Sequence, residues 1–481
     1  MKMIIGGKKT DSKDGNVIEV FNPATQELLD TVPSATREDI EMCLEIAQEG
    51  KKVWADTPLY KRAEILIKYA EAIEKNKKEL AELECRELGK RIIECEFEVQ
   101  VAANIFRGYV ERANHLYGET IPTDNREGSA NDIIFTRREP LGVIACIVPF
   151  NFPVELYAQK VAPALTMGNA IIVKPATDNP LAVTRLVELL IECGIPGSVA
   201  QVVTGRGSVI GKLMIPSPKI DAVSLTGSTD VGIDIFKESA QPFHRIFFEL
   251  GGNDALIIFE DADMKLAVNE AFAGRMLNAG QCCCATKRIL VQNSIKKEFT
   301  KRLINKLSEV IIGNPIDKNT EIGCLISEKA ASEVEKQIEL TIRQGAKLAY
   351  GGKRDGAFYQ PTVLTEVTDE MDIAKNMEIF GPVFPIIGFD TPEEALAISN
   401  GSQYGLNGGV ITSDINKAIQ TASKMECGTV VINGADNYRH LDHAFGGYKM
   451  SGIGREGIAY TLEEMSQVKT YVLKGVLKKI K

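Results

Sequence analysis

Short apolar runs recur along the chain and alternate with longer segments in which apolar residues return every three or four positions. The runs are rich in Val and Ile, as expected for strands that are covered on both faces of a parallel sheet. We predict strands at 142–148, 170–174, 200–204, 222–226, 255–259, 288–292, 385–389 and 428–433. Alternating strands and helices indicate an α/β fold, in which ligands bind at the carboxyl ends of the strands.

Helices are expected between these runs. Thr36 and Asp39 have the spacing of a capping box, so a helix should begin there and run towards Trp54. Residues 60–89 have the pattern of one or two long amphipathic helices. Two strand-like segments stand apart, 124–138 and 464–473, and neither completes a sheet alone.

Length, charge and cysteine content narrow the class of protein. A chain of 481 residues is too long for one core and implies two or three domains. The net charge of −9 argues against nucleic acid or an anionic membrane as the main partner. No apolar run has the length of a membrane span, and no secretory signal is apparent. Ten cysteines, three of them contiguous, fit a reducing compartment, so we expect a cytoplasmic protein.

Two residues offer a thiol nucleophile and a base. Cys283 lies in Asn-Ala-Gly-Gln-Cys-Cys-Cys-Ala at 278–285, and Glu249 lies in Phe-Glu-Leu-Gly-Gly-Asn at 248–253. A thiolate adds readily to an aldehyde carbon, and a carboxylate can activate the water that hydrolyses the resulting thioester. Most free cysteines are simply small buried hydrophobes, so the surrounding motif decides between the two interpretations.

Six motifs, in order along the chain, resemble the aldehyde dehydrogenase superfamily. They are Phe-Asn-Pro at 21–23, Pro-Phe-Asn-Phe-Pro at 149–153, the two motifs above, Glu-Ile-Phe-Gly-Pro at 378–382 and Gly-Gly-Tyr-Lys-Met-Ser-Gly-Ile-Gly-Arg-Glu at 446–456. The resemblance implies a Rossmann-like cofactor domain (1–118 and 141–250), an α/β catalytic domain (251–448) and a small β oligomerisation arm (119–140 and 462–481). It also implies a homodimer or a homotetramer.

The resemblance assigns roles to three residues. The family places its cysteine two residues after the Gly-Gln pair, which selects Cys283 as nucleophile and leaves Cys282 and Cys284 structural. Glu249 corresponds to the base that directs water onto the thioester, and Asn151 to the amide that stabilises the oxyanion. Adjacent cysteines cannot easily wrap one tetrahedral ion, so no metal site is expected.

Two alternatives remain open. A CoA-acylating dehydrogenase of the same fold would transfer the acyl group to CoA, and Glu249 argues against it because many such members lack this residue. A non-catalytic binding or structural protein could retain the fold, but it has no need of a nucleophile, an oxyanion donor and a base together.

The cofactor is expected to be NAD(P). Gly227 and Ser228 follow an apolar run and open a helix, so their amides could face a pyrophosphate. Gly207 lies in a weaker glycine-rich turn. Glu378 and Phe380 resemble the family pair that holds the nicotinamide ribose and ring.

Three further residues bear on cofactor choice. Lys174 corresponds to the lysine that bonds the adenosine ribose, and Phe150 replaces a tryptophan that the family more often has near the cofactor. NAD-preferring members often carry glutamate at the position of Thr177, where it would repel a 2′-phosphate. We therefore expect NADP to be preferred and NAD to be accepted, although the adjacent Asp178 works against this if it points inward.

Substrate choice rests on the loop before Gly446, which lines the substrate tunnel in the family. Arg439 and His440 in this loop, which ends at Phe445, could bind an anionic group, and Arg107 lies on a helical stretch that also borders the tunnel in the family. Most arginines are surface residues, so a structural role remains the alternative. The loop has few apolar side chains, which favours a small polar or anionic aldehyde over a fatty one.

Overall fold

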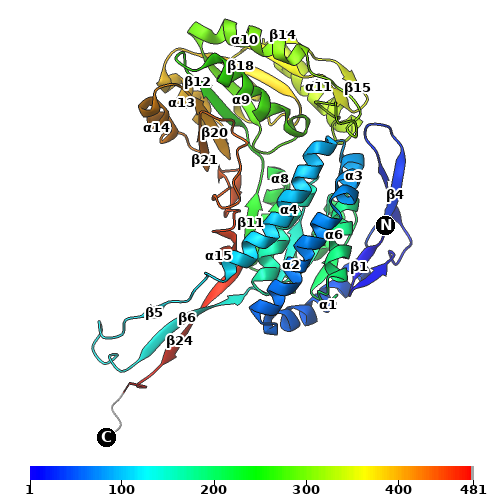
Figure 1. Ribbon diagram of the computed structural model, residues 1–481, viewed down its shortest axis with the longest axis vertical. Coiled ribbons are helices and arrows are strands. Elements are labelled where there is room, and N and C mark those ends of the chain that lie inside the picture. The colour runs from blue at the N-terminus through cyan, green and yellow to red at the C-terminus, as the bar shows by residue number, and fades with distance from the viewer. Residues whose placement is uncertain (478–481) are drawn as a thin grey trace.

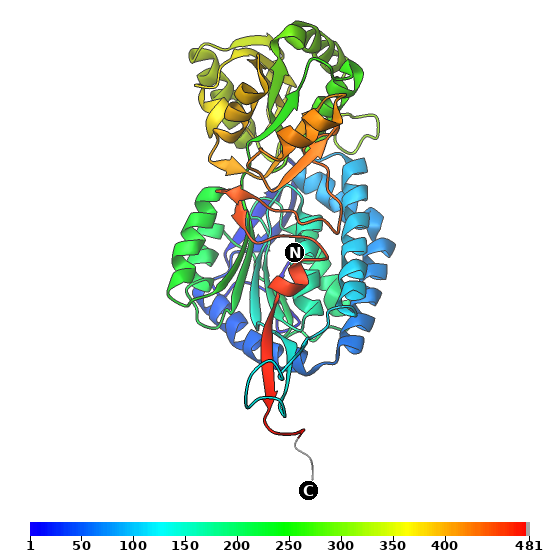
Figure 2. The same cartoon turned by 90° about the vertical axis from the view of Figure 1, so that its left-hand side faces the viewer.

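The computed structural model describes residues 1–477 and consists of two lobes and a projecting arm (Figure 1). Each lobe is built around one sheet, and the arm leaves the end of the first lobe that lies away from the second (Figure 2). This α/β architecture confirms the predicted fold class. No helix within these residues is long and apolar enough to cross a membrane.

The first lobe contains an eight-stranded sheet in the order β2-β1-β9-β8-β7-β10-β11-β23. The strands from β9 to β11 are parallel, whereas β1 and β23 run antiparallel to their neighbours. The strands are β1 (Met3–Ile5), β2 (Lys8–Thr10), β7 (Val143–Ile147), β8 (Ala170–Lys174), β9 (Ala200–Val202), β10 (Ala222–Thr226), β11 (Arg245–Glu249) and β23 (Gly452–Ile453).

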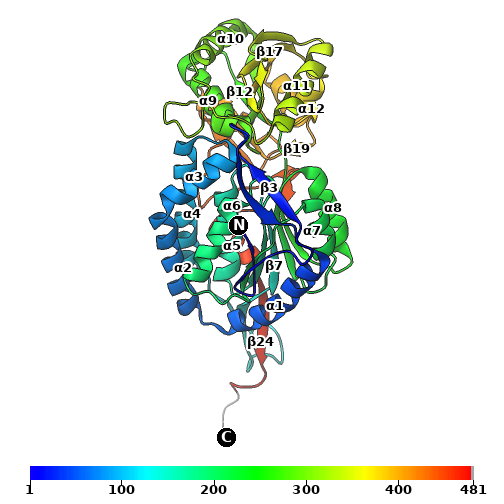
Figure 3. The same ribbon diagram turned by 90° about the vertical axis from the view of Figure 1, so that its right-hand side faces the viewer.

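Helices cover both faces of this sheet (Figure 3). One face packs against α1 (Arg37–Asp56), α7 (Gly207–Met214) and α8 (Thr229–Ala240). The other packs against α2 (Leu59–Lys75), α3 (Lys77–Leu88), α4 (Ile92–Ala113), α5 (Pro153–Thr166) and α6 (Leu181–Glu192). The predicted capping box is present, because the Thr36 hydroxyl accepts from Asp39 N and the Asp39 carboxylate accepts from Thr36 N.

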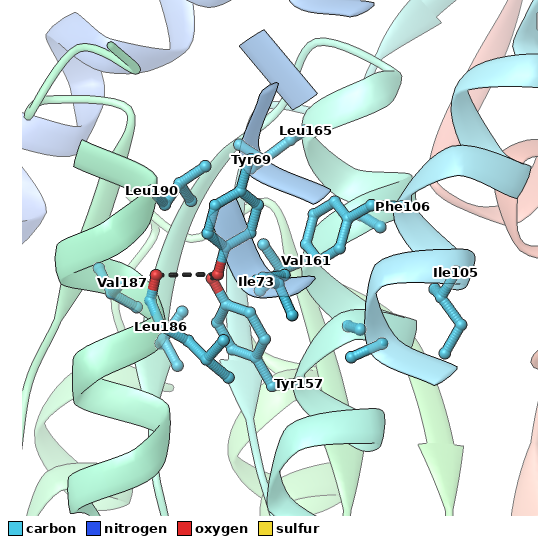
Figure 4. Close-up of a cluster of buried hydrophobic side chains, with 14 of the residues drawn as sticks. Tyr69, Ile73, Ile105, Phe106, Tyr157, Val161, Leu165, Leu186, Val187 and Leu190 are labelled. Atoms are coloured by element: carbon cyan, nitrogen blue, oxygen red, sulfur yellow. Dashed lines mark hydrogen bonds between the residues drawn. The ribbon is translucent and has the colours of Figure 1, made fainter. Parts of the chain in front are cut away.

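Aromatic side chains join four of these helices in the core (Figure 4). The rings of Tyr69 on α2 and Phe106 on α4 meet edge to face with centroids 4.8 Å apart. The Tyr69 hydroxyl donates to Leu186 O on α6 at 2.8 Å and lies 3.1 Å from the Tyr157 hydroxyl on α5. Because buried hydroxyls are costly without partners, this network fixes how α5 sits against its neighbours.

The second lobe contains a seven-stranded sheet in the order β14-β17-β18-β13-β12-β20-β21, parallel except for β14. Its strands are β12 (Asp254–Ile258), β13 (Thr286–Gln292), β14 (Lys347–Tyr350), β17 (Thr362–Val367), β18 (Val383–Phe389), β20 (Asn407–Ile411) and β21 (Thr429–Ile432). Its helices are α9 (Met264–Met276), the 3-10 turn η1 (Leu277–Gly280), α10 (Asn293–Ser308), α11 (Glu328–Arg343), α12 (Asp372–Lys375), α13 (Pro392–Asn400) and α14 (Ile415–Ala422).

All eight predicted strands are present, with ends that differ by at most two residues. In the two large sheets the prediction missed β1, β2, β11, β14, β17, β20 and β23. Among these, β11 has a charged residue at each end, β17 contains a glutamate, and β20 begins Asn-Gly-Gly. Apart from β23, which returns to the first sheet, the strands of the two sheets divide between β11 and β12. That division supports a domain boundary near 250, which remains a prediction.

The arm is a three-stranded antiparallel sheet of β5 (Thr120–Ile121), β6 (Ile133–Pro140) and β24 (Ser466–Leu473), preceded by α15 (Thr461–Glu464). The two segments that stood apart in the sequence thus pair with each other. The remaining described strands form small pairs, β3 (Val17–Phe21) with β4 (Leu28–Pro33), β15 (Arg354–Asp355) with β16 (Phe358–Tyr359), and β19 (Tyr404–Gly405) with β22 (Tyr448–Lys449). The last four residues of the predicted arm, 478–481, lie outside the described residues.

Candidate active site

A cavity of about 460 Å³ lies between the carboxyl edge of the first sheet and the amino edge of the second. Asn151 follows β7, Ser228 follows β10 and Glu249 ends β11, while Cys283 precedes β13. Eight of the predicted site residues line this cavity: Phe150, Asn151, Gly227, Ser228, Glu249, Cys283, Glu378 and Phe380. The two lobes therefore supply different parts of one site.

The loop that carries Cys283 begins with three consecutive residues of positive φ. These are Asn278 (φ 48°), Ala279 (54°) and Gly280 (78°), and a side chain on Gly280 would overlap the carbonyl of Gly381. The Asn278 side-chain amide donates to Asn151 O at 2.8 Å. This contact ties the thiol loop to the Asn151 loop across the two lobes.

The environment of the Cys283 thiol favours its protonated form. Its neighbour Cys282, together with burial, raises the pKa of Cys283 to about 12. A thiol with so high a pKa reacts slowly unless a base removes its proton or a positive charge is brought beside it. The base must come from the cavity, because Cys282 and Cys284 are themselves buried thiols.

Glu249 is the carboxyl group in a position to serve as that base. It is 3% exposed, and neither of its oxygens accepts a hydrogen bond from the described residues. Burial, and then the nearby charge of Cys283, raise the pKa of Glu249 well above its usual range. A carboxyl group with a raised pKa and no partner is suited to exchanging protons with a substrate or a water.

Asn151 is buried and is held on both sides. The Asn179 side-chain amide donates to Phe150 O at 2.7 Å on one side. On the other side, Glu98 Oε1 accepts from Val154 N and Glu155 N, both at 2.8 Å, and so caps the start of α5. A fixed amide donor beside a nucleophile can stabilise an oxyanion at low reorganisation cost.

The residues predicted to bind the adenosine ribose lie together at the end of β8. Lys174 is 6% exposed and makes no ion pair with any residue in 1–477, and burial lowers its pKa to about 8. A Cβ placed on Gly207 would lie 3.6 Å from Lys174 Nζ, and the Thr177 hydroxyl donates to Gly205 O at 3.3 Å. Asp178 is exposed. The buried amine without an acidic partner suits a ligand that is anionic or rich in hydroxyls.

Ser228 caps α8, because its side chain accepts from Val231 N at 3.4 Å. The helix start faces the same cavity, which leaves its amides available to an anion. Glu378 lies across the cavity, with its carboxylate 3.0 Å from Lys287 Nζ. The Phe380 ring meets the Phe150 ring edge to face, with centroids 5.9 Å apart.

The residues predicted to bind the substrate differ in burial and in their ionic partners. Arg439 is 17% exposed and pairs with Glu456 at 2.7 Å and Glu155 at 3.5 Å, while its guanidinium lies 4.2 Å from the centre of the Phe445 ring. Lys160 also pairs with Glu456, at 3.0 Å, so two cations face two carboxylates. Arg439 is therefore already neutralised, which favours a structural role over the binding of an anion.

Two predicted substrate residues lie elsewhere. Arg107 forms a bidentate pair with Glu74, with both contacts at 2.6 Å, and does not line the cavity. The His440 side chain is 61% exposed. We therefore leave Arg107 and His440 out of the proposed site. Phe445, by contrast, is buried in a cluster that includes the cysteine triplet.

Sequence reasoning missed Lys287 and Asn278. Lys287 is fully buried at the start of β13, where it contacts both Glu378 and the carbonyl of Cys283. Two adjacent basic residues, Lys287 and Arg288, directly before the apolar run Ile-Leu-Val were the available signal. Asn278 lies within the cysteine motif, but its link to Asn151 depends on the fold.

Comparison with known proteins agrees with this geometry. The Aldehyde dehydrogenase family matches residues 9–471. The lactaldehyde dehydrogenase of Methanococcus aeolicus is 40% identical over 98% of this chain and 99% of its own. The 3-sulfolactaldehyde dehydrogenase of Priestia aryabhattai is 37% identical over 95% of this chain and 94% of its own.

A solved structure agrees as well. The glyceraldehyde-3-phosphate dehydrogenase GapN from Methanocaldococcus jannaschii, complexed with NADP, is 38% identical, with a TM-score of 0.91 over 95% of this chain and 99% of its own. The match covers both lobes and the motifs that line the cavity. The chain belongs to the aldehyde dehydrogenase family.

Proposed function

We propose that this enzyme oxidises a small, uncharged 2-hydroxyaldehyde to its carboxylate, with NADP preferred over NAD. The observation that carries the proposal is the cavity shared by Cys283, Glu249 and Asn151. A nucleophile, a base and an oxyanion donor around one space are what covalent oxidation of an aldehyde requires.

The chain's own residues account for the steps at carbon. Glu249 takes the proton of the Cys283 thiol as the sulfur attacks the carbonyl, and the side chain of Asn151 and the backbone N–H of Cys283 stabilise the oxyanion of the resulting thiohemiacetal. Bound NADP would supply the hydride acceptor, and loss of the hydride would leave a thioester on Cys283. After Glu249 has passed the thiol proton to solvent, it takes a proton from the water that hydrolyses the thioester, and the sulfur of Cys283 leaves as the thiolate.

The residues present fit the cofactor. Lys174 and Thr177 would hold the adenosine ribose, Gly207, Gly227 and Ser228 the pyrophosphate side, and Phe150, Glu378 and Phe380 the nicotinamide side. The absence of a glutamate at Thr177 and the unpaired Lys174 support the acceptance of a 2′-phosphate. The NADP complex of the related GapN structure is consistent with that preference.

The proposed substrate class follows from the substrates that appear in the relatives' names and from the charged residues of the proposed tunnel loop in this chain. Lactaldehyde, 3-sulfolactaldehyde and glyceraldehyde 3-phosphate are all three-carbon aldehydes with a hydroxyl on carbon 2, and they differ at carbon 3. Arg439, which lies in the proposed tunnel loop, is neutralised by Glu155 and Glu456. An uncharged carbon 3, as in lactaldehyde, therefore fits best.

The arm supports a homodimer or homotetramer. Val468, Val472 and Leu473 of β24 are exposed apolar residues on a sheet that projects from the molecule. Such a surface is costly in water and is typical of a contact between subunits. All ten cysteines are free, which supports a place in the reducing cytoplasm.

The test compares kcat/KM for lactaldehyde, glyceraldehyde 3-phosphate and propanal with saturating NADP, with and without CoA. We expect lactaldehyde to exceed the other two by at least about tenfold, which is about 1.4 kcal/mol of transition-state preference. A preference for the phosphorylated aldehyde would overturn the substrate proposal. A requirement for CoA would overturn the hydrolytic mechanism in favour of acyl transfer.

A further inference from the structure

The cysteine triplet has a geometry that its spacing in sequence does not suggest. Ala285 N donates to Cys282 O at 3.2 Å, so residues 282–285 form a tight turn. This turn gathers the three sulfurs of Cys282, Cys283 and Cys284 within 4.8 Å of one another. The sulfurs of Cys282 and Cys284 are only 3.5 Å apart.

We propose that the three thiols form a binding site for Zn²⁺ and that zinc thereby switches the enzyme off reversibly. A tetrahedral zinc ion with Zn–S bonds of about 2.3 Å holds its sulfur ligands about 3.8 Å apart. The Cys282–Cys284 separation of 3.5 Å is close to this value, and no pair exceeds 4.8 Å, so small side-chain rotations bring all three sulfurs onto one ion. Thiolate is a soft ligand that zinc accepts readily.

Zinc binding requires the thiols to lose their protons, and positive charge near the triplet offsets the thiolates that form. Two buried cations, Arg275 and Lys287, interact electrostatically with Cys282, and Lys287 also contacts the carbonyl of Cys283. Arg275 Nη1 has no hydrogen-bond partner among the described residues. These positive charges offset the negative charge of a zinc ion bound by three thiolates.

The fourth ligand comes from the cavity. Cys283 and Glu249 both line it, so an ion on the three sulfurs can take either a water molecule or the Glu249 carboxylate as its remaining ligand. Binding converts three thiols to thiolates and releases three protons to solvent, and no oxidant or reductant is needed.

Zinc binding occupies the sulfur that attacks the aldehyde, so it abolishes turnover. This loss of turnover rests on the proposed role of Cys283, whereas the binding itself does not. A chelator that removes the ion restores the thiol unchanged, because no covalent bond between protein atoms has formed.

The test uses tag-free full-length enzyme without cofactor. Zinc affinity is measured by competition with a chromogenic chelator, and cadmium–thiolate absorbance in the near ultraviolet gives an independent readout of sulfur ligation. The variants are Cys282→Ala and Cys284→Ala, with Cys43→Ala, a buried cysteine of α1, as the matched control. Glu249→Gln distinguishes a carboxylate from a water as the fourth ligand.

We expect one zinc per chain, loss of activity that parallels occupancy, and recovery with a chelator. Cys282→Ala and Cys284→Ala should keep their activity but bind zinc at least about 100-fold more weakly, whereas Cys43→Ala should behave as the native chain. Unchanged affinity in the two flanking variants would overturn the site. Zinc binding without inhibition would leave the site standing and contradict the role of Cys283.

Discussion

Replacing Thr177 by Glu tests the cofactor preference most directly. Thr177 lies three residues beyond Lys174 at the end of β8, and its hydroxyl reaches Gly205 O at 3.3 Å. Gly207, two residues after Gly205, lies close to the Lys174 amine. A carboxylate at 177 would therefore enter the place that we assign to the ribose and its 2′-phosphate.

The size of the effect follows from simple electrostatics. Two unit charges about 5 Å apart repel by about 3 kcal/mol at an effective dielectric constant of about 20. A phosphate carries about 1.5 to 2 charges, but Thr177 is only partly buried, and solvent screening removes roughly half of the repulsion. The net penalty against NADP is about 3 kcal/mol, which corresponds to roughly a 100-fold change.

The assay is the ratio of kcat/KM for NADP to that for NAD, measured at constant ionic strength with one aldehyde. We expect Thr177→Glu to lower this ratio by roughly 100-fold. Thr177→Gln should change the ratio far less, because glutamine has the size of glutamate but no charge. An unchanged ratio in the Glu variant would show that residue 177 does not face the 2′-phosphate. Equal shifts in both variants would point to side-chain size rather than charge.

Three further outcomes are expected. Cys283→Ala should lower kcat by at least about 10³-fold in stopped assays of product, whereas Cys284→Ala should retain most of the activity, and equal losses would refute the choice of nucleophile. Because burial raises the pKa of Glu249 and only the carboxylate can act as a base, kcat should rise with pH through a midpoint above the ordinary carboxyl value of about 4.3, and Glu249→Gln should abolish that rise. Replacing both Val468 and Val472 by Lys should reduce the mass measured by light scattering to that of a smaller assembly, and a native mass in this variant would exclude these exposed side chains from the contact.

Periodicity was sufficient to locate the buried parallel strands, because each is a short Val- and Ile-rich run between helices. It failed for β11, whose last residue Glu249 lines the cavity, and for β20, whose Gly408 and Gly409 pack closely against Met425 and Leu256. Sequence patterns respond to burial, and the strands that approach a functional site are the ones in which burial competes with other demands.

In the candidate site, too, some features could be predicted from the sequence and others could not. Motifs identified Cys283, Glu249 and Asn151, since each lies in a short segment with a distinctive spacing. They could not indicate that Arg439 is neutralised by Glu155 and Glu456, which are 284 and 17 positions away and meet it only in the fold. Charge in a sequence is formal, whereas the charge available to a ligand depends on which partners the fold supplies.

The ladder between β6 and β24 also bears on how the chain is made. Gln467 donates a hydrogen bond to Pro140 O from 327 positions away. Translation proceeds at about 5 to 20 residues per second, so β24 is synthesised about 16 to 65 seconds after β6. During that interval the apolar half of β6, Ile-Ile-Phe at 133–135, is an open edge to which a neighbouring nascent chain could add. The charged half that follows, Arg-Arg-Glu at 137–139, then acts as a gatekeeper that limits aggregation during synthesis.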